Sequence, residues 1–406
     1  MEFDESGLYN IKAALDGERY SLYDLATWKN GLAFKKSDFS EKGRPIIKIA
    51  ELNNGISANT SYTQKDFGEE VFCCWDDLLF SWSGNPQTSI DVFRYRLPDG
   101  WLNQHIFKIT ANESIVTKEY IYYVLKFLKP RFTQIATNKQ TTGLGHVTIA
   151  DLKRLSLIIP PKSAQIRIVS ILKSIDDIIE LNNRINENLA QQAQAIFVNM
   201  FVENETTIPA TVADVSLNVT DGVHNTVHDD PEGDFLLLSC KNIKGGSLSI
   251  GSSERRISFD TFVKLRRRTK LSKGDVLISS VGTVGELLLL NVEPSNYEFQ
   301  RSVAMVKPNT NIVSPAYLYE ALVFRRAELI NAAHGAVQQC LFISDIAGFP
   351  IGIPQPDDLR DFDTTVVPMF NIISVNEAEN HRLAEMRDAL LPKLMSGELD
   401  VSNINL

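Results

Sequence analysis

The chain has 406 residues, with 41 Lys and Arg against 50 Asp and Glu, and a formal net charge of −9. This length predicts two or three domains, and 44% hydrophobic with 22% charged residues excludes a disordered chain or a simple coiled coil. No apolar run reaches the roughly 18 residues of a membrane span. The four cysteines form no disulfide framework or metal-ligand spacing, so a cytoplasmic protein is expected. The acidic balance argues against nonspecific coating of nucleic acid, because phosphate binding depends on Lys and Arg.

Two stretches, about 190 residues apart, show the same order of sequence features. Residues 19–160 contain the strand candidates PIIKIAELNNG and DDLLFSWSGNP, then a Tyr-rich helix candidate, TKEYIYYVLKF, and a strand that closes on Pro. Residues 206–354 repeat the order with FLLLSCKNIKGG, GDVLISSVGTVG, SPAYLYEALVF and FPIGIPQP. The strand predictions depend on β-branched and aromatic runs bounded by Gly and Asn. The sequence therefore predicts an α+β (mixed α/β) protein with two related globular domains.

A long helix is expected after each domain, within residues 161–205 and 355–406, whereas residues 1–18 form an N-terminal tail. Residues 164–201 contain neither Gly nor Pro, and their apolar residues alternate in steps of four and three, the pattern of packed helices. Because Pro is tolerated only in the first turn of a helix, the second helix is expected to begin near Pro368.

Pairing Pro160 with Pro354 gives an offset of 194 residues that aligns the two helices. The same offset places Asn at two equivalent positions of each apolar stripe, namely Asn182 and Asn186 in the first helix and Asn376 and Asn380 in the second. In an antiparallel pair centred near residue 184, Asn182 faces Asn380 and Asn186 faces Asn376, and the polar pairs set the register. The alternative is that these Asn residues lie at the solvent edge of a broad stripe.

The charge differs between these parts of the chain. The net charges are −4 for residues 1–18, +4 for 19–160, −2 for 161–205, −1 for 206–354 and −6 for 355–406. Within the second domain eight basic residues lie in 19 positions, namely Arg255, Arg256, Lys264, Arg266, Arg267, Arg268, Lys270 and Lys273. Such a stripe can follow phosphates in a domain of nearly neutral charge, and the alternative is a solvated surface.

The sequence contains none of the motifs that would carry catalysis. It has no G-x-x-x-x-G-K-[ST] phosphate loop, no H-E-x-x-H or C-x-x-C spacing and no G-x-S-x-G nucleophile turn. We therefore predict no catalytic residue, no bound metal and no cofactor in this chain.

The alternation of two α/β domains with two long helices resembles the DNA-specificity subunit of Type I restriction–modification systems. The resemblance covers nearly the whole chain, and LKRLSLIIPPKSAQIRIVSILKSIDDIIELNNRI, its copy after Ile353 and the C-terminal LLPKLMSGEL carry most of it. GDVLISSVGTVGE and FQRSVAMVKP look like the inner part of the family's target-recognition domains. The segment DDLRDFDTTVV departs from the family pattern, because it lacks the usual Gln/Ile start of the second helix.

The resemblance implies a non-catalytic subunit that binds double-stranded DNA. Each target-recognition domain would read one half of a split, asymmetric sequence, and the antiparallel helix pair would hold the two readers at a fixed spacing. Two methyltransferase (modification) subunits using S-adenosylmethionine, and restriction subunits driven by ATP and Mg, would carry the chemistry as partners. The apolar helices with their acidic outer face would then dock the methyltransferases, or else only pack against each other.

The candidate DNA contacts are basic residues for phosphates and amide, hydroxyl and guanidinium groups in loops for bases. In the first domain they are Lys35, Lys36, Lys42, Arg44, Asn85, Gln87, Arg94 and the loop Asn138, Lys139, Gln140, Thr141 and Thr142. In the second domain they are Lys241, Asn242, Arg266, Arg267, Arg268, Thr283, Arg301, His334, Gln338 and Gln339. The loops NKQTT and HGAVQQ precede the last short helix of each repeat, so they occupy equivalent positions.

Two other classes of protein remain open at this point. One is a self-contained methyltransferase or nuclease with its own recognition domains, but it would need a cofactor-binding Gly motif and a catalytic motif that the chain lacks. The other is a scaffold whose repeats bind protein and not DNA. A DNA-binding assay distinguishes such a scaffold from a DNA-specificity subunit.

Overall fold

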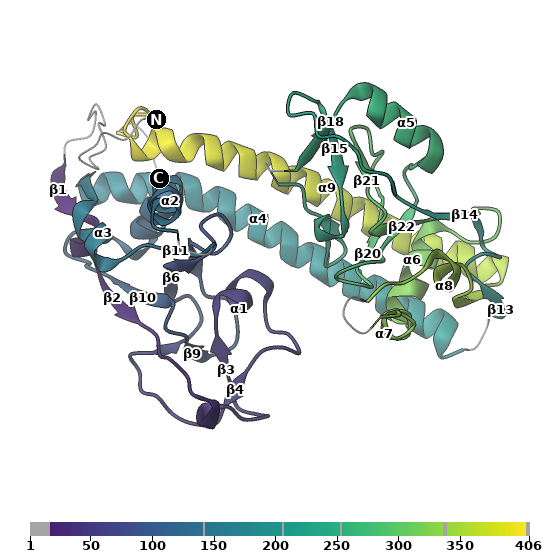
Figure 1. Ribbon diagram of the computed structural model, residues 1–406, viewed down its shortest axis with the longest axis horizontal. Coiled ribbons are helices and arrows are strands. Elements are labelled where there is room, and N and C mark those ends of the chain that lie inside the picture. Colours follow the sequence, from purple (N-terminus) through teal and green to yellow (C-terminus); the bar gives the residue numbers. More distant parts are fainter. Residues whose placement is uncertain (1–16, 141–142, 205–206, 252–253, 336–338, 403–406) are drawn as a thin grey trace. The chain divides into compact units, whose positions relative to one another are not determined.

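The computed structural model describes residues 17–140, 143–204, 207–251, 254–335 and 339–402 (Figure 1). The chain divides into two compact units. Unit 1 comprises residues 1–178 and 382–406, and unit 2 comprises residues 179–381. Within the described ranges, no helix is both long enough and apolar enough to cross a membrane.

Unit 1 is built on an antiparallel sheet in the order β2-β10-β6-β8 and a second sheet in the order β4-β3-β9-β5, in which β3 and β9 are parallel. Two short ladders, β1-β12 and β7-β11, complete it. The strands are β1 (Glu18–Ser21), β2 (Ala26–Asn30), β3 (Arg44–Ile47), β4 (Tyr62–Thr63), β5 (Phe72–Cys73), β6 (Leu78–Ser81), β7 (Ser83–Gly84), β8 (Asp91–Arg94), β9 (Gly100–Leu102), β10 (Ile106–Ala111), β11 (Gly145–His146) and β12 (Ser156–Ile159). The helices are α1 (Ile49–Asn54), α2 (Lys118–Asn138) and α3 (Ile149–Arg154).

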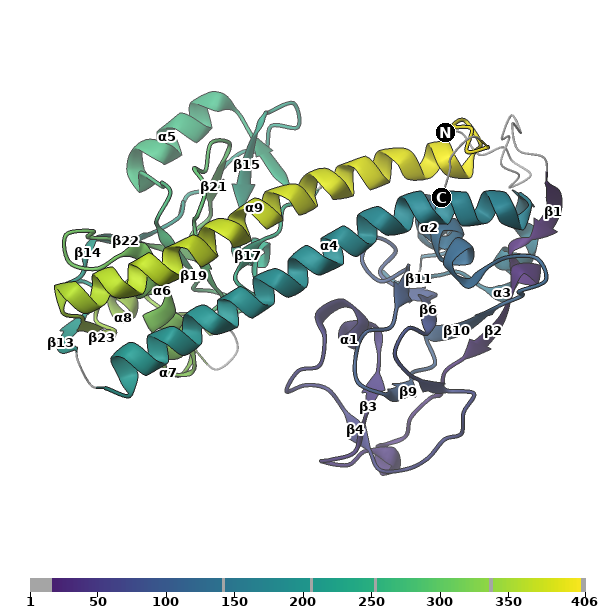
Figure 2. The same ribbon diagram turned by 180° about the vertical axis from the view of Figure 1, so that it is seen from behind.

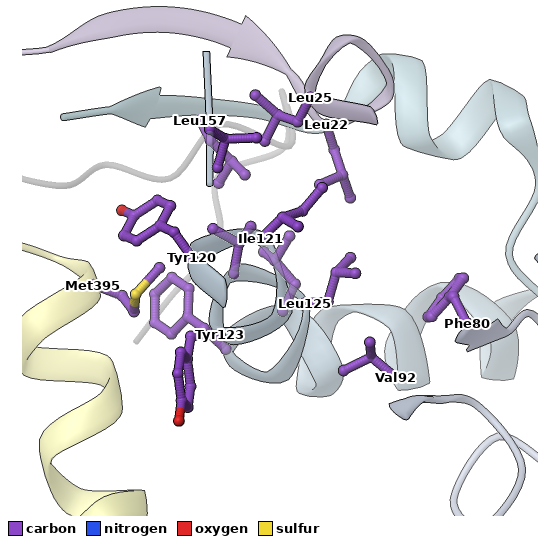
Figure 3. Packing of buried hydrophobic residues seen from close by; sticks show 14 of the residues in the cluster. Leu22, Leu25, Phe80, Val92, Tyr120, Ile121, Tyr123, Leu125, Leu157 and Met395 are labelled. Carbon is purple, nitrogen blue, oxygen red and sulfur yellow. The ribbon is translucent and has the colours of Figure 1, made fainter. Parts of the chain in front are cut away.

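The core of unit 1 forms around α2, whose buried face carries Ile121 and Leu125 (Figure 3). Phe80 of β6 and Val92 of β8 pack in the same cluster as this helix. Met395, near the C-terminal end of the last helix, also belongs to this cluster. These residues lie far apart in the sequence. Burial of their apolar surface therefore holds together the two chain segments that make up unit 1.

Unit 2 has an antiparallel sheet in the order β14-β22-β19-β20 and a second sheet in the order β18-β15-β21, in which β15 and β21 are parallel. Its strands are β13 (Ile208–Thr211), β14 (Ser216–Asp221), β15 (Phe235–Leu238), β16 (Ile243–Lys244), β17 (Ser247–Leu248), β18 (Arg255–Ile257), β19 (Val276–Ser279), β20 (Leu287–Leu289), β21 (Tyr297–Phe299), β22 (Val303–Pro308) and β23 (Pro350–Ile353). Its short helices are α5 (Phe259–Thr269), α6 (Pro315–Phe324), α7 (Arg326–Asn331) and α8 (Ile343–Ala347).

The two units repeat one topology, as the sequence predicts. The four-stranded antiparallel sheets have equivalent orders, and each unit pairs its first strand with its last, as β1-β12 and β13-β23. The offset of 194 residues carries both ends of β12 onto those of β23 and the start of α3 onto the start of α8. The α+β fold class with an internal repeat is therefore confirmed.

The two long helices are α4 (Lys162–Phe197), continued by one π-helical turn (Val198–Val202), and α9 (Pro356–Met395). The expected start of the second helix near Pro368 is wrong, because Pro368 lies inside α9. An internal Pro costs about 3 kcal/mol through its lost hydrogen bond and its ring clash. Phe362, Val366 and Phe370 on both sides of Pro368 are buried in the core of unit 2, and their burial offsets this cost.

In unit 2 the two helices lie side by side and run antiparallel (Figure 1, Figure 2). Asn182 Nδ2 donates to Asn380 Oδ1 at 2.9 Å, and Asn376 Nδ2 donates to Asn186 Oδ1 at 2.8 Å. These are the pairs that the antiparallel arrangement predicts, and Asn182 is only 7% exposed. Beyond these pairs, Ala193 and Phe197 of α4 are buried in the core of unit 2, and Ile196 is half-buried against that core.

Candidate nucleic-acid interface

In unit 2 several loops meet beyond the ends of β15 and β19. Ser280 N donates to Ser302 O at 2.9 Å, and Leu341 N donates to Ser280 O at 2.8 Å. Cys240 N donates to Ser302 Oγ at 3.1 Å, which adds the loop after β15. We call this group the unit 2 loop cluster; its segments are residues 222–225, 239–242, 280–285, 300–302, 334–335 and 339–341.

Unit 1 builds the same arrangement from its own copies of these loops. Trp82 N donates to His105 O at 3.2 Å, and Val147 N donates to Trp82 O at 2.8 Å. Asn53 Nδ2 at the end of α1 donates to Thr88 O at 3.3 Å. The unit 1 loop cluster comprises residues 31–34, 48–54, 82–89, 103–105, 139–140 and 143–147.

One glycine in each unit shows how closely the two backbones correspond. A Cβ atom added at Gly31 would lie 2.3 Å from the carbonyl oxygens of Leu102 and Asn103. At Gly222 it would lie 2.1 Å and 2.2 Å from the carbonyl oxygens of Phe299 and Gln300. Only glycine allows this close approach of two segments, so both loop clusters have the same backbone requirement.

The unit 2 loop cluster brings together side chains that the sequence predicts as DNA contacts. Lys241, Thr283, Arg301, His334 and Gln339 are all exposed there. Lys241 forms an ion pair with Glu254 at 2.9 Å. The remaining candidate of the HGAVQQ loop, Gln338, lies outside the described residues.

The unit 1 loop cluster contains Asn85, Gln87 and Gln140 as exposed residues, and Asn138 is exposed at the end of α2. The pairing of Gly84 with Gly145 holds the Ser-Gly turn against the segment that follows the NKQTT loop. Asn85 Oδ1 accepts from Gln87 N at 2.9 Å, which shapes this turn. Thr141 and Thr142 lie outside the described residues.

Four basic candidates of unit 1 lie in the stretch from segment 31–34 of the cluster to the first residue of β3. Lys35, Lys36 and Lys42 are exposed before β3, and Arg44 begins that strand. Lys35 and Lys36 directly follow segment 31–34 of the cluster, whereas Arg44 lies at the opposite end of β3 from segment 48–54, about 10 Å away for a strand of this length. The Arg44 guanidinium lies 4.9 Å from the ring centre of Phe72, so part of its surface is already packed.

Arg94 and Lys139 also have partners within the domain. The Arg94 guanidinium lies 4.5 Å from the ring centre of Tyr122. Lys139 forms an ion pair with Asp151, the residue that caps α3 together with Thr148. Burial raises the pKa of Asp151, but Lys139 and Thr148 outweigh this effect and the pKa is lowered overall. Lys139 therefore stabilises the start of α3.

Two candidates of unit 2 require correction. Asn242 is 2% exposed; its Oδ1 accepts from Ser239 N at 2.9 Å and its Nδ2 donates to Ser249 O at 2.8 Å. This side chain closes a loop and is not available to a base. The physical reason is that an Asn side chain can satisfy backbone groups of a turn as readily as it can bind a ligand.

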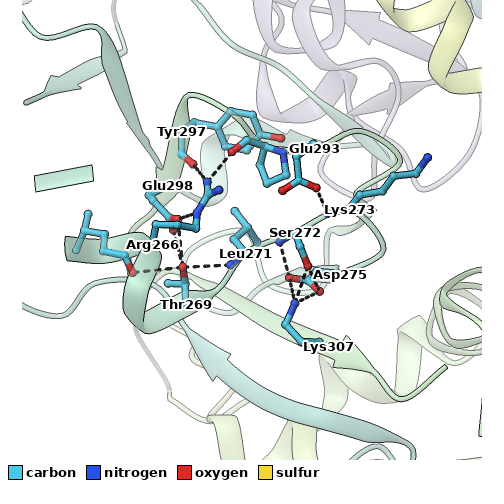
Figure 4. Close-up of polar contacts among 12 residues, drawn as sticks. Arg266, Thr269, Leu271, Ser272, Lys273, Asp275, Glu293, Tyr297, Glu298 and Lys307 are labelled. Carbon is cyan, nitrogen blue, oxygen red and sulfur yellow. Dashed lines mark hydrogen bonds and ion pairs between the residues drawn. The ribbon is translucent and has the colours of Figure 1, made fainter. Parts of the chain in front are cut away.

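Arg266 is the second correction, because its guanidinium points into unit 2 (Figure 4). It forms an ion pair with Glu298, whose side chain is fully buried, and donates to Tyr297 O at 2.9 Å. Burial raises the pKa of Glu298, although Arg266 and Thr269 oppose the shift. A buried carboxylate needs a cation and hydrogen bonds, so Arg266 serves the fold.

The neighbouring arginines differ from Arg266. Arg267 is exposed, and Arg268 donates to the carbonyl oxygens of Asp221 and Gly222. Because Gly222 begins a segment of the loop cluster, the end of α5 lies beside that cluster. All three arginines occupy the last turn of α5, where positive charge also complements the helix dipole.

Titratable groups near the unit 2 loop cluster form pairs and not a metal site. His224 Nε2 lies 2.6 Å from Asp221 Oδ2, and His334 Nε2 lies 3.4 Å from Asp345 Oδ2. The His334 ring is stacked 5.4 Å from that of Phe342. Over the described ranges, no group of three or more His, Cys, Asp and Glu side chains could hold a metal ion.

Residues 16–191 match the protein family described as the Type I restriction modification DNA specificity domain. The chain is 23% identical over 420 residues to the EcoBI specificity subunit of Escherichia coli, covering 94% of this chain and 86% of the relative. It is 27% identical over 336 residues to the MjaIX specificity subunit of Methanocaldococcus jannaschii, covering 74% and 73%.

A solved structure of a Type I system S subunit from M. genitalium shares the fold, with a TM-score of 0.52 and 16% sequence identity. The match covers 95% of this chain and 97% of that structure. The resemblance to Type I specificity subunits that the sequence indicates is therefore confirmed.

The structure places two residues in the unit 1 loop cluster that the sequence did not indicate. Gln104 and His105 lie at the junction of β9 and β10, inside the unit 1 loop cluster. They stand in the apolar run WLNQHIFKIT, which reads as a strand. A residue-by-residue alignment of this run with YEFQRSVAMV of the second repeat pairs Arg301 with His105, so the sequence alone does not relate Gln104 to Arg301.

Proposed function

We propose that this chain is the sequence-specific DNA-binding subunit of a Type I restriction–modification complex, and that each unit reads one half of a bipartite, asymmetric target. The observation that carries the proposal is the duplicated loop cluster. Equivalent backbone hydrogen bonds join the loops in both units, but Asn85 of one corresponds to Thr283 of the other, and His146 to Cys340. Recognition of two different half-sites requires two domains that share an arrangement of loops but carry different side chains in it.

The helix pair would set the distance between the half-sites. Asn182 and Asn186 of α4 pair with Asn380 and Asn376 of α9, and a polar pair in an apolar seam penalises any shifted register. A fixed register makes the spacer length of the DNA target a property of this chain.

The partners would be two methyltransferase subunits and the restriction subunits. Leu181 of α4 and Val375 of α9 are related by the offset of 194 residues and are 56% and 64% exposed. Ile178 and Ile372 form a second exposed pair at the same offset. Equivalent apolar positions on both helices fit two copies of one partner. Catalysis, S-adenosylmethionine, ATP and Mg would belong to these partners, and the complex would work in the cytoplasm.

The proposal is tested with the chain co-purified with its methyltransferase, in a mobility-shift assay on fragments of host DNA. We expect a subset of fragments to be retained in the presence of excess nonspecific competitor. Retention of all fragments alike, or of none, would contradict the proposal, and the second result would favour a protein-binding scaffold.

Arg267 supplies a test of the phosphate contact. Replacing it with Gln should weaken binding to every DNA sequence and lower the slope of log K against log salt by about 1, because one counterion fewer is released. The measurement is fluorescence anisotropy of the complex between 50 and 200 mM salt, in the range where such slopes are large. An unchanged slope would place Arg267 away from the DNA.

A further inference from the structure

Gln104 of unit 1 and Arg301 of unit 2 occupy the same backbone position. Gln104 N donates to Leu32 O at 2.9 Å, and Arg301 N donates to Val223 O at 3.1 Å. The next residue in each unit, His105 or Ser302, accepts a hydrogen bond from the segment after the central strand. The two side chains therefore start from equivalent points of the two loop clusters.

The Arg301 guanidinium has no partner among the described residues. The residue is exposed, and within the described ranges only its backbone groups form hydrogen bonds. This contrasts with Arg266 and Arg268, whose guanidinium groups are held by the domain. An arginine whose guanidinium has no partner in the described part of a polar loop cluster is available for bidentate contacts.

Gln104 is half-buried and held in place. Its Nε2 lies 3.2 Å from His105 Nε2, and the His105 ring lies 5.6 Å from that of Trp82. Trp82 Nε1 in turn donates to Asn30 Oδ1 at 2.9 Å. One N–H of the Gln104 amide is thus engaged, while the second N–H and the carbonyl oxygen remain for a ligand.

We propose that Gln104 and Arg301 are equivalent base-reading residues, and that Gln104 selects adenine in one half-site and Arg301 selects guanine in the other. This assignment rests on the proposed function. A Gln amide can pair with N6 and N7 of adenine, and a guanidinium can pair with O6 and N7 of guanine. Each pairing needs one free donor and acceptor, or two donors, which these side chains retain.

The variants Arg301→Gln and Gln104→Glu test the assignment in the chain co-expressed with its methyltransferase. Arg301→Gln exchanges one preference for the other at an exposed position, and Gln104→Glu is nearly isosteric but favours cytosine N4 over adenine. Arg154→Gln is the matched control, because Arg154 is exposed at the end of α3, outside both loop clusters. The readout is the set of methylated sites, determined by sequencing the host DNA.

We expect each variant to change one base pair of one half-site, with about tenfold loss of discrimination for the original base, and to leave the other half-site intact. The control should give the original target. Variants that methylate the original target unchanged, or that change both half-sites together, would contradict the assignment of Gln104 and Arg301 but not the proposed function. An unaltered chain that directs no sequence-specific methylation would contradict the proposed function and the assignment with it.

Discussion

Replacing Arg266 with Met is expected to lower the free energy of unfolding of unit 2 by about 3–5 kcal/mol, the typical cost of removing one partner of a buried ion pair. Glu298 would remain fully buried and would keep only Thr269 as a side-chain partner. Two backbone carbonyls, of Pro294 and Tyr297, would also lose their donor.

Hydrogen exchange of peptides from α5 and β21 during urea unfolding measures this loss. All four tryptophans lie in unit 1, so their fluorescence follows that unit separately and should not change. Arg267→Met is the matched control, because the neighbouring side chain is exposed and its loss should change stability by less than about 0.5 kcal/mol. The double variant R266M/E298M should be more stable than R266M, because it removes the unpaired charge. Equal stability of R266M and R267M would contradict the structural role of Arg266.

Replacing Glu320 with Gln is expected to stabilise unit 2 at neutral and alkaline pH. Glu320 is 2% exposed on α6, and among the described residues its Oε2 atom has no hydrogen-bond partner. Burial raises its pKa to about 8. Counted from the N-caps Thr117 of α2 and Ser314 of α6, the equivalent residue of unit 1 is Tyr123, which donates to Asp176 at 2.7 Å, and Asp176 pairs with Arg387.

The offset of 194 residues explains why Glu320 lacks such partners. It relates Asp176 to Phe370 and Arg387 to Ala193, and both of these residues of unit 2 are apolar and buried. The positions that hold the charged partners of Tyr123 in unit 1 are therefore apolar in unit 2, and the charged form of buried Glu320 is poorly solvated.

The direction of the pH effect follows from the raised pKa of Glu320. Between the ordinary value near 4.5 and the folded value near 8, the folded state binds the proton more tightly, so stability falls as the pH rises. The penalty for wild type reaches about 3 kcal/mol at pH 7 and is complete above pH 8. E320Q should therefore exceed wild type by about that amount at pH 7 and by less than about 1 kcal/mol at pH 5. Hydrogen exchange of α6 at both pH values checks this, and equal stability throughout would contradict it.

Much of the architecture could be predicted because each strand, helix and proline pattern occurs twice in the sequence, once in each repeat. Pairing Pro160 with Pro354 correctly relates β12 to β23 and α4 to α9. The predicted start of the second helix was wrong because it depended only on the low helix propensity of Pro368. That propensity takes no account of the burial of Phe362 and Phe370, which stabilises the helix on both sides of the proline.

The candidate site was less predictable, because residue type does not show where a side chain points. Arg266 and Arg267 are adjacent and chemically identical, yet one pairs with buried Glu298 and the other faces solvent. Gln104 escaped notice because it stands in an apolar run. Only the hydrogen bonds between loops show that Gln104 corresponds to Arg301.

Sequencing of methylated sites in a host that carries the chain with its methyltransferase tests the central claim most directly. Two units that each read their own half-site predict one bipartite motif, with two different specific parts separated by a fixed number of unread base pairs. A continuous motif, a palindromic motif or methylation without any motif would contradict that claim.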